Sequence, residues 1–193
     1  VEIEGTIPIG AGLGSSAALC VAIARFVLWK EARDHQNIEN WLALATHLED
    51  VFHGKSSGMD VSVIAHSKPV LFSLGTSEVL SLDCAKLPKF EFYDSGLRGS
   101  TRDCIEKVKA WNLAHPTRVQ TVDDQMGMAT ELALRSMILF EQDPQKGIEG
   151  IAAAMKQAQD CFETWGLVPA ELIKQKTELL NQGAMAVKLT GAG

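Results

Sequence analysis

The sequence predicts an α+β protein of two lobes, because short strand-like segments are concentrated in its first half and long helical segments fill its second half. The change falls near residues 83–89, and we place the lobes at residues 1–85 and 86–193. With 193 residues, of which 46% are hydrophobic, the chain can bury one large core or two modest ones.

The first lobe is expected to begin with a strand at residues 1–7, where apolar and polar residues alternate until Pro8 ends the pattern. Two helices follow at residues 16–33 and 37–53, the second with Asn37 as its N-cap and Gly54 as its stop. Residues 59–65 fit a strand or a helix equally well on periodicity alone. A predicted hairpin of residues 69–74 and 78–82 completes this lobe, and one more short strand is predicted just past the boundary, at residues 90–93.

The second lobe is predicted to be mainly helical, because its segments are long and rich in helix formers. The expected helices are residues 102–113, 121–141, 144–164 and 169–181. A final strand at residues 184–189 is expected to lead into a glycine cluster at residues 191–193.

Charge and composition exclude several function classes. Lys and Arg number 18 against 24 Asp and Glu, so the net charge of −6 has the wrong sign for nucleic-acid binding through the overall field. The longest apolar run, residues 17–24, is far shorter than the roughly 18 residues that a membrane span needs. No two of the four cysteines have the two-residue spacing of a zinc or redox site, so we expect reduced thiols and a soluble, cytoplasmic protein. Because the chain opens on Val1 and stops inside a glycine cluster, we also expect further residues on either side.

A glycine-rich loop at residues 8–18 joins the first predicted strand to the buried helix. Backbone N–H groups at a helix start attract anions, and glycines lack the Cβ atoms that would keep a phosphate away. The loop has neither the lysine of a Walker A loop nor the glycine spacing of a dinucleotide fingerprint. We therefore expect a phosphate loop of another kind, in which the Ser16 hydroxyl is an N-cap or a Mg²⁺ ligand. The backbone N–H groups that this loop could offer to a phosphate belong to Gly10, Ala11, Gly12, Leu13, Gly14, Ser15 and Ser16.

Two acidic residues, Glu49 and Asp60, flank a second loop at residues 54–58. Since Glu49 is near a helix end and Asp60 follows the loop, their carboxylates can converge on one pocket. One acid would then hold Mg²⁺ against nucleotide oxygens, while the other orients an attacking hydroxyl or accepts its proton. A single acidic residue is usually a solvated surface charge, but the neighbours of Asp60 are apolar: Met59, Val61, Val63 and Ile64.

Three motifs in order resemble those of the GHMP kinase superfamily, named for galactokinase, homoserine kinase, mevalonate kinase and phosphomevalonate kinase. Residues 8–18 resemble its phosphate loop, and residues 187–193 resemble the start of its C-terminal glycine motif. The stretch from Glu49 to Asp60 resembles the second motif of the mevalonate kinases, where a glutamate precedes a His-Gly-x-x-Ser-Gly-x-Asp segment. Lys55-Ser56 stands where that family usually has Asn-Pro, which bears more on the substrate than on the kinase assignment.

The resemblance implies roles for individual residues. Ser16 and Glu49 would ligate Mg²⁺, and Asp60 would be the catalytic carboxylate. Gly191 and Gly193 would join the first loop in binding ATP. Thr101, from a segment at residues 95–102 that has counterparts near the family's acceptor site, is a candidate for substrate contact, and so is His53.

The resemblance also implies a fold and an activity. The fold would be the two-lobed GHMP kinase fold, truncated at both ends, with an N-lobe like ribosomal protein S5 domain 2, a ferredoxin-like C-lobe and ATP between them. The activity would be transfer of the ATP γ-phosphoryl group to a small-molecule alcohol, mevalonate first, in isoprenoid precursor synthesis. Phosphomevalonate kinase, a GHMP sugar kinase and a non-catalytic nucleotide-binding protein are the alternatives.

The family uses a lysine upstream of this chain, so the chain alone is expected to be nearly inactive. No nucleic-acid or membrane partner is expected, and a homodimer is allowed.

Overall fold

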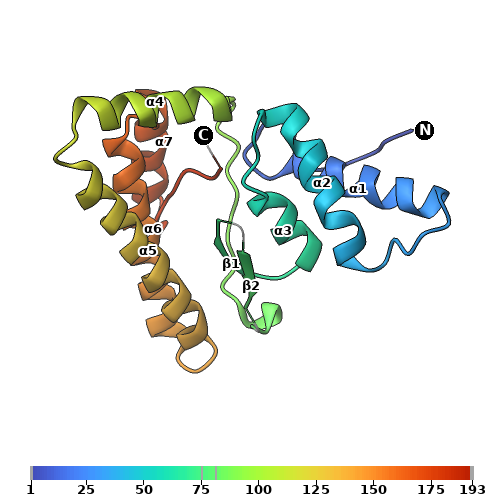
Figure 1. Ribbon diagram of the computed structural model, residues 1–193. Helices are drawn as coiled ribbons and strands as arrows, with labels where there is room; N and C mark the ends of the chain where they lie inside the picture. The colour runs from blue at the N-terminus through green and yellow to red at the C-terminus, as the bar shows by residue number, and fades with distance from the viewer. Residues whose placement is uncertain (1, 75, 81, 192–193) are drawn as a thin grey trace. The chain divides into compact units, whose positions relative to one another are not determined.

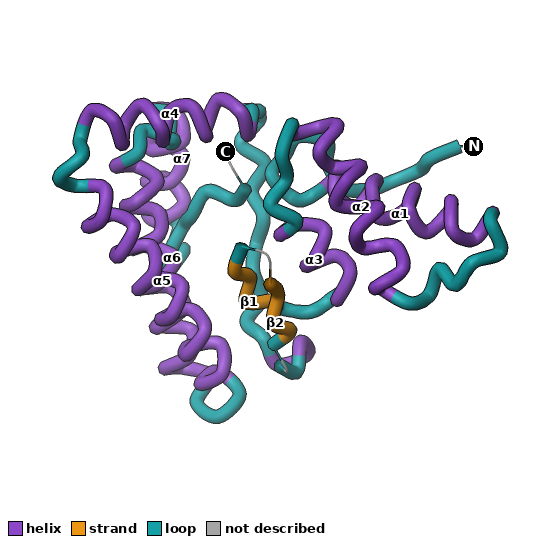
Figure 2. The backbone as a smooth tube through the Cα atoms, in the orientation of Figure 1, coloured by secondary structure: helices purple, strands orange, loops and turns teal. Residues whose placement is uncertain are grey.

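The computed structural model describes residues 2–74, 76–80 and 82–191 (Figures 1 and 2). Helices dominate it, with one small antiparallel sheet, so the α+β class is confirmed at this coarse level. Contacts between residues divide the chain into two compact units, residues 1–81 and 82–193. The assignment of residues 1–85 and 86–193 to the two lobes of the kinase family stays a prediction.

The first unit is built on three helices, α1 (Ser15–Lys30), α2 (Ile38–His53) and α3 (Met59–His66). Both predicted signals of α2 are confirmed, since the Asn37 side chain accepts a hydrogen bond from the Glu39 N–H and Gly54 ends the helix with φ 80°. The segment that fitted strand or helix equally is helix α3. The core where the three helices meet consists of Ala17, Cys20, Val21, Ala24, Leu28, Trp41, Ala45 and Val61.

A hairpin follows α3, formed by the strands β1 (Val70–Ser73) and β2 (Thr76–Val79). The two strands are antiparallel and Val70 is paired with Val79. The predicted hairpin is confirmed, but its second strand begins at Thr76 rather than at residue 78, because the register pairs Ser73 directly with Thr76.

Three predicted strands are wrong: among the described residues, 2–7, 90–93 and 184–189 form no strand. Alternation of apolar and polar residues makes a segment compatible with a sheet, but a strand exists only where a neighbour pairs with its backbone. In the last of the three segments the backbone is bonded otherwise. The Ala184 N–H donates to the Leu179 carbonyl at 3.1 Å, and the Leu189 N–H donates to the Gln159 side chain at 2.8 Å.

The second unit contains the four helices that the sequence predicts, α4 (Thr101–Ala114), α5 (Val119–Phe140), α6 (Pro144–Thr164) and α7 (Ala170–Asn181). A short 3₁₀ turn, η1 (Cys84–Lys86), precedes them. Helices α5 and α6 form an antiparallel pair, visible in Figure 1 as two helices joined by a short turn. In the described part of the chain, no helix has both the length and the apolar character needed to cross a bilayer.

Glycines allow α5 and α6 to approach closely. A Cβ atom added at Gly147 would lie 2.4 Å from the Cα of Phe140, and one added at Gly150 would lie 2.2 Å from the Oγ of Ser136. The clash at Gly147 cannot be relieved by a side-chain rotation, because the nearest atoms belong to the Phe140 backbone. The two helices therefore come into close contact near the turn that joins them.

The substitution Gly147→Ala is expected to lower the free energy of unfolding by about 1–3 kcal/mol, since the new methyl group must displace the α5 backbone. The matched control is Gly127→Ala in α5, where an added Cβ has no neighbour within 4 Å. This control should raise stability by about 0.5–1 kcal/mol, because alanine is the better helix former. Urea unfolding of both variants checks the prediction, and equal shifts of the same sign would contradict it.

Candidate active site

The glycine loop leads directly into α1, as the sequence predicts. Gly10, Gly12 and Gly14 have φ values of 70°, 67° and 71°, a left-handed conformation that other residues rarely adopt. Gly14 is the N-cap of α1 and has no side chain to cap it, so Ser16 lies within the first helical turn and is not the N-cap. A loop of this kind, at the positive end of a helix, can bind a phosphate group through its backbone.

The side chain of Glu49, near the end of α2, is only 2% exposed. It accepts a hydrogen bond from the Ser56 hydroxyl. Burial raises the pKa of the Cys20 thiol in α1, and the nearby negative charge of Glu49 raises it further. Since Cys20 is four residues after Ser16, both lie on the same face of α1, and α1 packs against α2, the helix that carries Glu49.

Sequence reasoning missed the part that Ser56 plays in this site. Its hydroxyl donates to Glu49 and accepts the Gly58 N–H at 3.0 Å, while its own N–H donates to Oδ1 of Asp50 at 2.7 Å. Ser56 thus joins the second loop to the end of α2 and fixes the Glu49 carboxylate. The signal in the sequence was a hydroxyl residue inside the acidic motif, at a position where the family usually has proline.

Asp60 lies in the first turn of α3, and its side chain is exposed. Met59 and Val63 are also exposed, at 46% and 42%, so the expected apolar surroundings of Asp60 are wrong on those sides. Asp60 and Ile64 are four residues apart and share one face of α3. The Cδ1 atom of Ile64 lies 3.8 Å from the position of a Cβ on Gly14, so this face of α3 packs against the glycine loop.

The residues present fit a Mg²⁺ ion. Glu49 takes part in none of the ion pairs found among the described residues, although a buried carboxylate normally requires a positive partner. No group of three or more Asp, Glu, His or Cys side chains in the described ranges could hold a metal ion by itself. A carboxylate with a hydroxyl, completed by phosphate oxygens and water, is a typical donor set for Mg²⁺ rather than for zinc.

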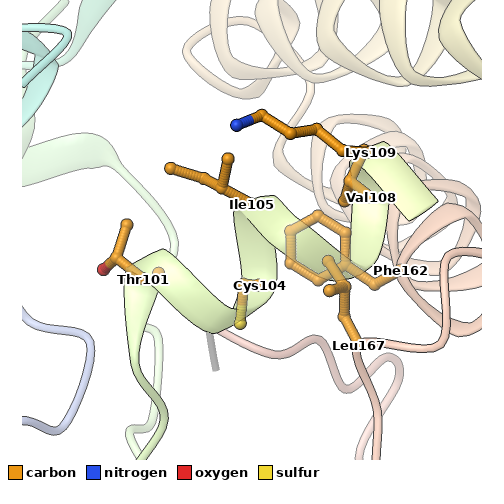
Figure 3. Close-up of a pocket in the computed structure, with 8 residues that line it drawn as sticks. Thr101, Cys104, Ile105, Val108, Lys109, Phe162 and Leu167 are labelled. Carbon is orange, nitrogen blue, oxygen red and sulfur yellow. The ribbon is translucent and has the colours of Figure 1, made fainter. Parts of the chain in front are cut away.

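Two further predicted residues meet in the second unit. Thr101 opens α4 directly after Ser100, whose side chain caps the helix by accepting the Asp103 N–H. Thr101 and Gly191 line one open depression of about 300 Å³, together with apolar side chains. Figure 3 shows Thr101 on α4, with the ring of Phe162 among the neighbouring side chains. The structure therefore brings a candidate substrate residue and a candidate ATP-binding residue, 90 positions apart, to one surface.

Two predicted residues cannot be placed. Gly193 lies outside the described residues, and the side chain of His53 does as well, although its backbone ends α2.

Comparison with known proteins finds one matching family model and several similar proteins named mevalonate kinase. Residues 1–68 match the family described as GHMP kinases N terminal domain. Over its whole length the chain is 31% identical to a mevalonate kinase of Thermococcus sibiricus, of which it covers 56%. It is 28% identical to a mevalonate kinase of Aeropyrum pernix and 27% identical to one of Arabidopsis thaliana, again over its whole length, and covers 57% and 53% of them. The chain thus spans about half the length of the curated relatives that it matches.

Proposed function

We propose that the protein carrying this chain transfers the γ-phosphoryl group of ATP to the hydroxyl of mevalonate, because residues 1–68 match the GHMP kinases N terminal domain and the whole chain is similar to proteins named mevalonate kinase. The observation that carries the proposal is the Glu49 carboxylate. It is 2% exposed and is held by the Ser56 hydroxyl, its charge acts on Cys20, one turn after Ser16 in α1, and it has no ion-pair partner among the described residues. A buried charge of this kind is costly unless a cation completes the site.

Each side chain then has a separate task. The backbone of residues 10–16 binds the phosphates of ATP at the positive end of α1. Ser16 and Glu49 would hold Mg²⁺, which when bound neutralises charge on the phosphate oxygens. Asp60, on the α3 face that packs against Gly14, orients the attacking hydroxyl and accepts its proton.

The second unit contributes to the same proposal. Gly191 and Gly193 bind nucleotide and Thr101 contacts the alcohol substrate, with His53 as a further candidate. The shared depression of Thr101 and Gly191 supports this part. The S5-like and ferredoxin-like lobes, the upstream lysine, the cytoplasmic location and a homodimer also remain predictions.

A substrate comparison tests the proposal. The protein that carries these residues is incubated with Mg²⁺ and ATP, and release of ADP is followed with mevalonate, phosphomevalonate or galactose. We expect turnover with mevalonate and at least about tenfold lower kcat/KM with the others, since a site built for one polar substrate leaves its groups unpaired with another. Turnover of galactose alone, or of phosphomevalonate alone, would assign the chain to another member of the superfamily.

A further inference from the structure

The described part of the C-terminal glycine motif, residues 187–191, is attached to helix α6 by side chains. The Leu189 N–H donates to Oε1 of Gln159 at 2.8 Å. Gln159 is only 3% exposed, so this hydrogen bond is shielded from competing water. Because the segment belongs to no strand, this side chain takes the place of a ladder partner.

The orientation of the Gln159 amide is itself determined. Its Nε2 donates to Oε1 of Glu163, one turn further along α6, at 3.0 Å. Glu163 also accepts from the ammonium of Lys176 in α7. Burial alone would raise the pKa of Glu163, but the hydrogen bonds from Lys176 and Gln159 outweigh it and lower that pKa. An ionised carboxylate only accepts hydrogen bonds, so it holds the NH₂ group of Gln159 and leaves Oε1 for Leu189.

Lys188, next to Leu189 in the chain, attaches the same segment to α6 a second time. The ammonium of Lys188 lies 4.3 Å from the centroid of the Phe162 ring, and it donates to the Leu189 carbonyl at 2.7 Å. Phe162 also lines the depression that contains Thr101 and Gly191. The two attachments to α6 therefore hold the backbone immediately before Gly191 at the edge of that depression.

We propose that Gln159, oriented by Glu163 and Lys176, is a positioning residue that holds residues 187–191 of the C-terminal glycine motif in place for nucleotide binding. The inference rests on the proposed function, in which Gly191 binds ATP. Gln159 touches no reacting atom, and it acts through the Leu189 backbone. A flipped or absent amide would release the segment and lower its affinity for phosphate without altering the groups that perform phosphoryl transfer.

The first experiment compares Gln159→Met with Gln157→Met. Gln157 is the matched control, because its side chain donates to the Gln125 carbonyl of α5 and not to the terminal segment. In Gln159→Met we expect the Leu189 amide to exchange with solvent at least about tenfold faster and Mg-ATP to bind about three- to tenfold more weakly, the effect of one lost hydrogen bond. The kcat at saturating ATP should change less than about twofold, since only binding is affected. Gln157→Met should leave both Leu189 exchange and ATP affinity unchanged.

The second experiment changes the orienting residue. Glu163→Gln keeps an acceptor oxygen for the Gln159 amide and should retain Leu189 protection and ATP affinity, whereas Glu163→Leu removes the acceptor and should lose both. Unchanged Leu189 exchange in Gln159→Met, or unchanged ATP affinity despite faster exchange, would overturn the positioning role alone. Wild-type protein that binds no ATP would overturn the proposed function, and this inference with it. Equal losses in the Gln157 and Gln159 variants would reduce Gln159 to a structural residue.

Discussion

Replacing Asp60 by Asn is expected to lower kcat by about 10²–10⁴-fold, the usual contribution of a positioned general base. An amide has nearly the shape of the carboxylate but cannot accept the proton of the substrate hydroxyl. Asp60 is exposed in the first turn of α3, so the loss of its charge should leave the fold and the melting temperature nearly unchanged. The KM for ATP should also stay within about threefold, because the loop backbone and Glu49 are retained.

The matched control is Glu39→Gln, which neutralises another acidic residue in the first turn of a helix in the same unit. Steady-state kinetics of both variants, with mevalonate and ATP varied in turn, give kcat and KM separately. A kcat for Asp60→Asn within a factor of three of the wild type would contradict the catalytic role and favour a non-catalytic, nucleotide-binding protein.

The second large effect is expected from Glu49→Gln. This change should raise the Mg²⁺ concentration needed for half-maximal rate by at least about 10–100-fold, the loss that even an outer-shell change causes in metal sites. The Ser56 hydroxyl can still donate to the amide oxygen of Gln, so the hydrogen bond at this buried position is kept. Since Glu49 has no ion-pair partner among the described residues, removing its buried charge relieves a desolvation cost, and the unfolding free energy should stay equal or rise.

The companion variant Ser56→Ala separates fold from metal binding. It keeps the Glu49 carboxylate but removes its hydroxyl donor, so the expected cost is about 1–3 kcal/mol of stability, with a smaller change in the Mg²⁺ requirement. The Mg²⁺ dependence of the initial rate and urea unfolding of both variants measure the two effects. If Glu49→Gln lost stability and Ser56→Ala shifted the Mg²⁺ requirement more, Glu49 would be a structural residue and not a metal ligand.

The helices could be predicted from the sequence because their signals are local. The cap at Asn37 and the stop at Gly54 each depend on hydrogen bonds within a few residues, and both are found where the sequence places them. The strand predictions at residues 2–7, 90–93 and 184–189 were wrong, because the evidence for a strand is not local. A strand needs a partner from elsewhere in the chain, and alternation does not reveal whether one is present.

In the candidate site, too, the features within short stretches could be predicted, and the contacts between distant residues could not. The glycine loop and the order of the acidic residues are properties of short stretches, and the family comparison supports the relationship that they indicate. The bond between Ser56 and Glu49 was not predicted, because the sequence shows only a departure from the family pattern at that position. Likewise, the anchoring of Leu189 by Gln159 joins residues 30 positions apart and leaves no periodic trace.

The sequence by itself determined the N-cap and stop of α2, the approximate bounds of the other long helices, the glycines of the loop before α1, and the acidic residues of the proposed site. Only the tertiary structure decided which of these groups meet. It buried Glu49 beside α1, turned the face of Asp60 toward Gly14, and placed Gly191 with Thr101 at one depression. The physical reason is that caps and turns are satisfied by neighbours in the chain, whereas burial, charge pairing and side-chain anchoring depend on packing between distant segments.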